Sequence, residues 1–172
     1  MKLSSEERTP AKKNGLIRAL FIIYLLFLVW SVLWKFNVPY IGDGTLRLIN
    51  LTPFSGNSNP EMRFNILIFV PFGLHISILA PDRALFKRAF VMLLASALFE
   101  ALQYILAIGR SDVTDLILNT LGGIVGMAVF SILTQLFGKN ARRALLVVCV
   151  AVTLFQLAVA VFFMLFGRIR IA

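Results

Sequence analysis

Six charged or amide side chains stand close together in a mostly apolar stretch of the chain, residues 99–123. They are three carboxylates, two amides and one guanidinium: Glu100, Gln103, Arg110, Asp112, Asp115 and Asn119. Arginine can pair with a phosphate, and carboxylates and amides can bind hydroxyl and amide groups. A soluble helix would simply expose such groups to water, whereas in a membrane each needs a partner or a function. The chemistry of this stretch therefore depends on whether it crosses a membrane.

The composition is that of a membrane protein. Hydrophobic residues make up 59% and charged residues 15% of the 172 positions. Soluble domains have about 45–50% apolar residues and about 25% charged residues. A transmembrane helix needs about 20 mostly apolar residues, and five segments approach that length: 16–34, 64–80, 88–108, 113–137 and 144–166. We therefore predict an all-α membrane protein, a bundle of about five transmembrane helices. One long outer loop joins the first two.

The basic residues are placed as membrane insertion requires. Three regions, 2–18, 83–88 and 139–143, hold eleven of the 17 basic residues, and the five predicted helices put all three on one side of the membrane. Positive charge concentrated on one side predicts a cytoplasmic N-terminus and an external C-terminus. Residues 1–15 are then a basic cytoplasmic segment, and residues 16–172 form a single transmembrane domain. Because insertion accounts for the net charge of +9, we expect the bilayer, and not a nucleic acid, as the partner.

Helical spacing brings the polar side chains to one region. One face of the third predicted helix carries Ser96, Glu100, Gln103, Tyr104 and Ala107, and one stripe of the fourth carries Asp112, Asp115, Asn119, Gly122 and Gly126. Counted from the turn between these helices, Glu100 lies roughly 14 Å deep and Asn119 roughly 10 Å. Asn65, with Arg63 beside it, enters at the outer end of the second helix. We predict that these groups converge on one outward-facing pocket.

Two interpretations of this polar cluster stay open. In the first, its amides and carboxylates join helices by hydrogen bonds worth about 0.6–2 kcal/mol apiece. Gly122 and Gly126 then allow close packing, and Asp112 caps the fourth helix with Asp115 in its first turn. In the second, the same groups line a water-accessible cleft that receives a polar head group from the outer leaflet.

The remaining unusual residues predict structure more than chemistry. Pro71 removes a backbone hydrogen bond and, with Gly73, predicts a kink, local unwinding or a hinge in the second helix. His75, the single histidine, is expected to be packed, and Cys149, the single cysteine, allows no disulfide. The carboxylates of the cluster could bind Mg²⁺ or Ca²⁺ through oxygen, but their spacing is unspecific. We therefore predict no metal, no cofactor and no catalytic residue.

Four motifs resemble those of the VanZ-like family of bacterial membrane proteins and follow its order over roughly residues 46–130: LINLTPF (48–54), FNILIFVPFG (64–73), FEALQ (99–103) and GRSDVTDLILNTLGGIVG (109–126). The resemblance implies a multi-pass protein of the bacterial plasma membrane, related to the member associated with low-level teicoplanin resistance. Carried over by position, the motif residues are Asn65, Glu100, Gln103, Arg110, Asp112, Asp115 and Asn119. Family members often carry a second acid where this chain has Thr114, which weakens any role for adjacent paired carboxylates.

The leading functional hypothesis is a non-enzymatic binding protein for a lipid, a lipid-linked cell-envelope component or a lipoglycopeptide. In it, Arg110 and Arg63 would pair with an anionic head group, and Asp115, Glu100 and Asn119 would orient the arginine or bind hydroxyl and amide groups. One alternative is a membrane enzyme for lipid-linked substrates with Glu100 or Asp115 as general base. Another is a structural subunit whose polar face is buried against a further membrane protein. The sequence names no protein partner.

Overall fold

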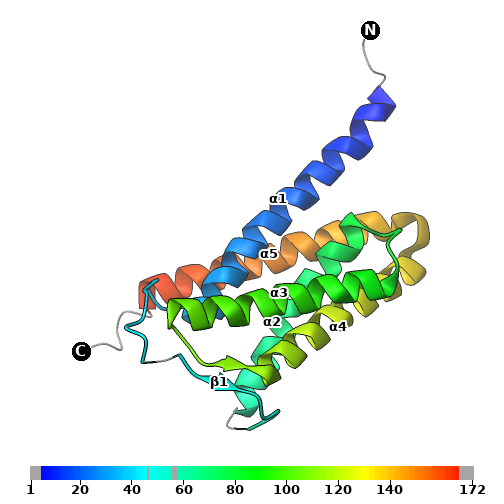
Figure 1. Cartoon of the computed structure of the whole chain (residues 1–172). Helices are drawn as coiled ribbons and strands as arrows, with labels where there is room; N and C mark the ends of the chain where they lie inside the picture. Colours follow the sequence, from blue (N-terminus) through cyan, green and yellow to red (C-terminus); the bar gives the residue numbers. More distant parts are fainter. Residues whose placement is uncertain (1–4, 46, 56–57, 167–172) are drawn as a thin grey trace.

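The described part of the chain forms five long helices. The computed structural model describes residues 5–45, 47–55 and 58–166, with side chains from residue 15 onward. Its elements, in chain order, are α1 (Ser5–Trp34), β1 (Ile49–Asn50), α2 (Asn59–Leu79), α3 (Leu85–Leu106), β2 (Ser111–Asp112), α4 (Val113–Phe137), the 3-10 turn η1 (Gly138–Asn140) and α5 (Ala141–Phe166). Figure 1 shows α2, α3, α4 and α5 gathered in a bundle, from which the first turns of α1 project.

Among the described residues, four segments are long and apolar enough to cross a membrane, by length and composition: Gly15–Trp34, Asn59–Leu79, Leu85–Leu106 and Val113–Phe166. The last has 54 residues and includes α4, η1 and α5 together. Figure 1 shows the chain reversing its direction at η1, so that α5 runs back along the bundle. This is a membrane protein; the number of five crossings and their orientation stay predictions.

The ends of the helices differ from the predicted bounds for local reasons. α1 begins at Ser5, inside the segment predicted to precede the first span; its lysine, glutamate, arginine and alanine residues favour a helix. α2 begins at Asn59 because Ser58 and Glu61 form a capping box. α3 ends at Leu106 because Ala107, with φ of 53°, is in the left-handed conformation.

Small residues set the contact between α2 and α4. A Cβ atom on Gly73 would lie 1.9 Å from the carbonyl oxygen of Gly123, and one on Gly126 would lie 2.0 Å from that of Val70. A Cβ on Gly122 would lie 2.2 Å from the carbonyl oxygen of Ile66. The two backbones therefore touch without side chains between them. α2 stays helical through Pro71, so the local unwinding predicted there does not occur, and Gly73 serves this contact.

A polar aromatic cluster fills the middle of the bundle. The fully buried Tyr24 donates its hydroxyl to the carbonyl of Ile68 at 2.8 Å and so joins α1 to α2. His75 stacks on Tyr24 and on Phe21, with ring centroids 5.6 and 5.3 Å away. Its Nδ1 lies 2.8 Å from the carbonyl oxygen of Pro71, and because a carbonyl can only accept, Nδ1 carries the proton. The packed histidine predicted from the sequence is confirmed.

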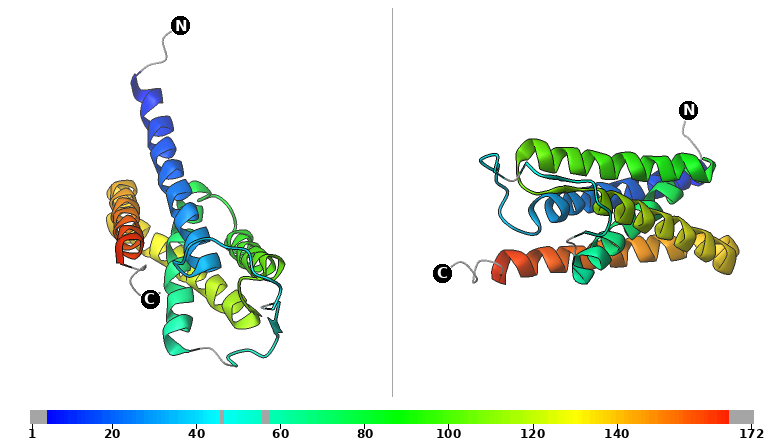
Figure 2. Two further views of the ribbon diagram at one scale, coloured as in Figure 1. Left: turned by 90° about the vertical axis from the view of Figure 1, so that its left-hand side faces the viewer. Right: turned by 60° about the horizontal axis from the view of Figure 1, so that its bottom comes forward.

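The long loop between α1 and α2 folds onto the turn that joins α3 to α4 (Figure 2). β1 and β2 pair in parallel, with Ile49 opposite Ser111 and Asn50 opposite Asp112. The N–H of Gly42 donates to the carbonyl of Leu106 at 2.9 Å. These two short strands are the exception to the predicted all-α fold. They fasten one long loop, residues 35–58, over the end of the bundle where the polar motif residues lie.

Candidate functional site

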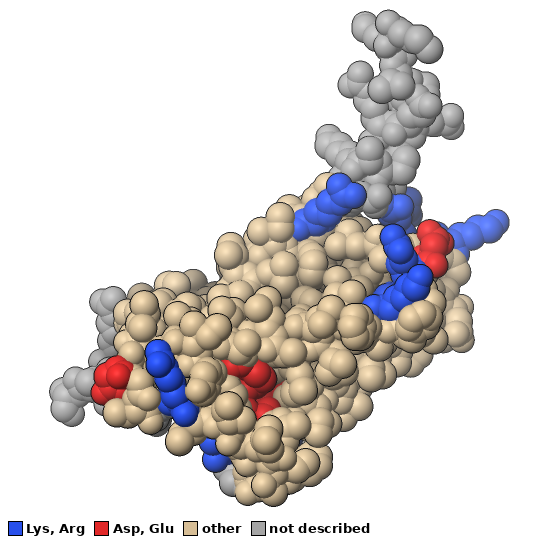
Figure 3. All heavy atoms as spheres, viewed as in Figure 1, with Lys and Arg blue, Asp and Glu red and all other residues tan. Residues whose placement is uncertain are grey.

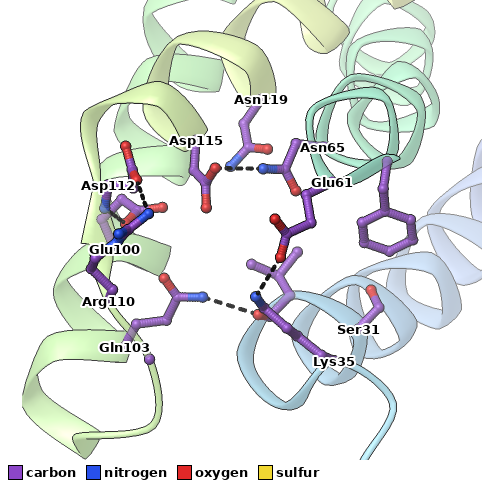
Figure 4. Close-up of a pocket in the computed structure, with 13 residues that line it drawn as sticks. Ser31, Lys35, Glu61, Asn65, Glu100, Gln103, Arg110, Asp112, Asp115 and Asn119 are labelled. Atoms are coloured by element: carbon purple, nitrogen blue, oxygen red, sulfur yellow. Dashed lines mark hydrogen bonds and ion pairs between the residues drawn. The ribbon is translucent and has the colours of Figure 1, made fainter. Parts of the chain in front are cut away.

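A cavity of about 310 Å³ opens at the end of the bundle near the α3–α4 turn. Its walls come from the last turn of α1, the first turns of α2 and α4, and the last two turns of α3 (Figure 4). The charged and amide side chains that line it are Lys35, Glu61, Asn65, Glu100, Gln103, Arg110, Asp112, Asp115 and Asn119. We call this cavity the polar pocket. Seven of the eight ligand-binding candidates from the sequence meet in it.

Asp112 accepts hydrogen bonds from three other residues of this region. Its side chain is 4% exposed, and one oxygen, Oδ1, accepts from the N–H of Thr114 at 2.8 Å and caps α4 as predicted. The other, Oδ2, accepts from Asn50 Nδ2 and from Arg110 Nη2, each at 2.9 Å. Burial raises the pKa of Asp112, but the hydrogen bonds from Asn50 and Thr114 and the charge of Arg110 outweigh it, so the pKa lies below its ordinary value.

This lowered pKa predicts a dependence of stability on pH. The ionised Asp112 stabilises the fold above the ordinary aspartate pKa of about 3.9, and the contribution is lost as pH falls through the lower folded-state pKa. In Asp112→Asn that site cannot titrate. We expect the difference in unfolding temperature between the wild type and Asp112→Asn, measured in detergent, to shrink from about pH 6 to about pH 3. A difference that stays constant over this range would contradict the prediction.

Two residues of α3 that line the polar pocket, Glu100 and Gln103, each have a buried acceptor oxygen. Glu100 Oε2 accepts from the N–H of Asp112 at 2.7 Å, which holds the α3–α4 turn, while its Oε1 is buried without a hydrogen-bond partner among the described residues. Gln103 Nε2 donates to the carbonyl of Val32 at 3.0 Å, and its Oε1 is likewise without a partner there. A buried acceptor left unsatisfied costs about 1–3 kcal/mol. Tyr104, placed on the same face by helical spacing, is exposed.

The amides Asn65 and Asn119 connect α4 to its neighbours. Asn65 Nδ2 donates to Asp115 Oδ1 at 2.6 Å and joins α2 to α4. Asn119 Nδ2 donates to Ser96 Oγ at 3.1 Å and joins α4 to α3. The side-chain oxygen of Asn119 is buried and without a partner among the described residues. The same side chains therefore join helices, as in the first interpretation, and line a cavity; the binding of a head group in the second interpretation stays a prediction.

Lys35 and Glu61 line the pocket although sequence reasoning did not select them. Lys35 Nζ lies 3.5 Å from Glu61 Oε1, and both side chains are largely exposed at the rim. Lys35 turns out of α1 with a positive φ of 47°, which no sequence pattern predicts for a lysine. Glu61 could have been found, because Ser58 and Glu61 have the spacing of a capping box.

The two arginines that were predicted to pair with an anionic head group differ in their position relative to the pocket. Arg63 is exposed and is not among the residues that line the pocket. It lies two positions after Glu61, about 200° around α2. Arg110 does line the pocket, but its Nη2 is 2.9 Å from Asp112 Oδ2 and its side chain is 42% exposed. Its charge is therefore already engaged by a carboxylate of the pocket wall.

Residues 21–135 match the family model described as VanZ/LLP1. The chain belongs to the VanZ/LLP1 family. It is also 38% identical to "Protein VanZ" of Enterococcus faecium over 120 residues, which cover 68% of this chain and 74% of that protein. No solved structure matches the chain. The lining residues of the polar pocket lie between Ser31 and Asn119, so the pocket falls wholly within the VanZ/LLP1 region, whereas α5 lies outside it.

Carboxylates of this VanZ/LLP1 pocket accept hydrogen bonds from protein groups. In the described part of the chain, no group of three or more histidine, cysteine, aspartate and glutamate side chains is placed to hold a metal ion. Asp112 is instead occupied by Asn50, Thr114 and Arg110. The side chains of this pocket are therefore arranged for hydrogen bonding and ion pairing.

Proposed function

We propose that this protein is a binding protein of the bacterial plasma membrane. Its polar pocket holds the head group of a lipid, of a lipid-linked cell-envelope component or of a lipoglycopeptide. The observation that carries the proposal is the cavity of about 310 Å³ lined by four carboxylates, two cations and three amides in an otherwise apolar bundle. Ionisable groups at membrane depth are costly and mark binding sites and pathways more often than packing.

The distribution of charge supports an outward-facing pocket. Figure 3 shows most of the Lys and Arg side chains of this face at the end of the bundle that carries the α2–α3 and α4–α5 turns, whereas acidic and basic side chains are mixed at the other end. Basic turns favour the cytoplasmic side of a membrane. The polar pocket, at the opposite end, then opens where envelope precursors and antibiotics are found.

Binding explains the geometry better than catalysis does. Ser31 is the hydroxyl side chain of the pocket lining, and it donates to the carbonyl of Leu28 at 3.0 Å. His75 is not part of the lining and is held by Pro71. A nucleophile needs a base within hydrogen-bond reach, which these two residues do not provide for each other. Glu100 or Asp115 as general base in an enzyme stays the second candidate, without a specific observation that favours it.

The test is native mass spectrometry of the protein in a mild detergent, with and without added teicoplanin. Asp115→Asn keeps an oxygen for the hydrogen bond from Asn65 but removes the charge. We expect the wild type to retain a lipid or teicoplanin adduct and folded Asp115→Asn to lose about 90% of it, the tenfold weakening that about 1.4 kcal/mol gives.

Asp82→Asn is the matched control, since Asp82 is exposed in the α2–α3 turn and its substitution makes the same chemical change away from the pocket. The control should bind as the wild type does. Absence of any adduct from all three proteins, together with a lower unfolding temperature for Asp115→Asn, would leave the polar pocket a purely structural contact and direct the search to protein partners.

A further inference from the structure

The polar pocket contains more hydrogen-bond acceptors than donors. Four carboxylates line it, from Glu61, Glu100, Asp112 and Asp115, against two cationic side chains, Lys35 and Arg110. Both cations lie beside carboxylates: Arg110 Nη2 is 2.9 Å from Asp112 Oδ2, and Lys35 Nζ is 3.5 Å from Glu61 Oε1. The pocket therefore has twice as many carboxylates as cationic side chains.

Three buried oxygens of the lining are without a hydrogen-bond donor among the described residues: Glu100 Oε1, Gln103 Oε1 and Asn119 Oδ1. The side chains of Gln103 and Asn119 are only 5% and 2% exposed. The orientation of the Gln103 amide is determined by its partner, because the carbonyl of Val32 can only accept and must face Nε2. The Gln103 side-chain oxygen then faces away from Val32. Figure 4 shows the Gln103 side chain among the others that line the pocket.

The chemistry of these oxygens selects among head groups. A phosphate presents acceptors, so it would meet like groups and like charge. A quaternary ammonium has positive charge but no N–H, and proteins bind it in cages of aromatic rings; Phe64 is the aromatic residue of this lining. A primary ammonium is a compact cation with three N–H donors, and three of the residues that line the pocket each carry a buried acceptor oxygen without a donor among the described residues.

We infer that the polar pocket receives a primary ammonium group, held by Glu100, Gln103 and Asn119. The inference rests on the proposed binding function and names the chemical class of the ligand. It replaces the anionic head group expected from the arginines. The ammonium can belong to a membrane lipid or to a soluble amine, and the two sources are separated below by the choice of probe.

The test uses the full-length protein with three phospholipids of identical acyl chains, offered in equal amounts and read by native mass spectrometry. Phosphatidylethanolamine carries a primary ammonium, phosphatidylcholine a quaternary one, and phosphatidylglycerol has no cation. We expect the phosphatidylethanolamine adduct to exceed each of the others at least about tenfold, a ratio that corresponds to about 1.4 kcal/mol. Glu100→Gln keeps an oxygen for the N–H of Asp112 and should reduce the preference to near unity, whereas Asp82→Asn should keep it.

The source of the ammonium is tested by adding free ethanolamine. Loss of the phosphatidylethanolamine adduct at millimolar ethanolamine would mean that the amine alone is sufficient. Persistence of the adduct would mean that the lipid-borne group is the ligand.

Other outcomes separate this inference from the function on which it rests. Equal retention of phosphatidylethanolamine and phosphatidylcholine, or preferred retention of phosphatidylglycerol, would overturn the ammonium while leaving a lipid-binding pocket. Retention of no lipid by the wild type, with no effect of ethanolamine on its unfolding temperature, would overturn both. The comparison of the three phospholipids needs only the wild type. It therefore tests the inference even if the Glu100→Gln protein does not fold.

Discussion

Replacement of Gly73 by alanine is expected to separate α2 from α4 and to destabilise the bundle by about 3 kcal/mol, the upper end for overpacked interiors. The added Cβ would lie 1.9 Å from the carbonyl oxygen of Gly123. Both sides of this contact are backbone, so no flexible side chain can move aside. Thermal or denaturant unfolding in detergent measures the change, and Gly126→Ala, whose Cβ would lie 2.0 Å from the oxygen of Val70, should behave alike.

Gly15→Ala is the matched control for these substitutions. Gly15 lies in α1, and a Cβ there would have no neighbour within 4 Å. Alanine favours a helix over glycine, so the control should unfold at the temperature of the wild type or slightly above it. If Gly73→Ala also unfolded at the temperature of the wild type, the close contact between α2 and α4 would be incorrect.

The second large effect is expected for Asp112→Ala. The substitution removes the cap of α4 and the acceptor of both Asn50 and Arg110. Loss of a cap costs about 1 kcal/mol and loss of hydrogen bonds to a charged group about 1.5–3 kcal/mol, so about 3 kcal/mol is expected in all. Because Asn50 belongs to β1, amide hydrogen exchange should increase in residues 48–54 as the long loop leaves the α3–α4 turn.

Asp43→Ala removes a carboxylate from the same loop without these consequences. Asp43 is exposed, and its side chain accepts from Thr45 within the loop. Its substitution should leave both the unfolding temperature and the exchange of residues 48–54 unchanged. Unaltered exchange in Asp112→Ala would show that the pairing of β1 with β2 holds the loop without help from the aspartate.

The stability of this end of the bundle and the composition of the pocket are linked. Asp112 and Glu100 hold the loop and the α3–α4 turn in place, while Asn65 and Asn119 join helices. Each of these side chains also lines the polar pocket. Substitutions that keep shape, such as Asp115→Asn and Glu100→Gln, are therefore the informative ones, because truncation would disturb both properties together.

The sequence was sufficient to predict features that depend on a single helix, such as its existence, its N-cap and the residues that share one face. The length of the apolar segments predicted the helices. The aspartate at position 112 predicted the N-cap of α4. The spacing of Glu100 and Gln103 placed both on one face of α3, since side chains three or four positions apart lie together on a helix. Polar residues at membrane depth were visible in the sequence because an apolar background makes each of them exceptional.

Tertiary structure decided what depends on how helices rotate and cross. Gly73, predicted to allow a kink or hinge in α2, lies against Gly123 of α4, a contact that no spacing within α2 could reveal. Arg63 points away from the pocket and Glu61 into it, because two residues turn a helix by about 200° and only the neighbours determine which side faces inward. The pairing of Arg110 with Asp112 and the docking of the long loop through Asn50 likewise needed the fold, since they join groups whose approach is set by the packing of the whole bundle.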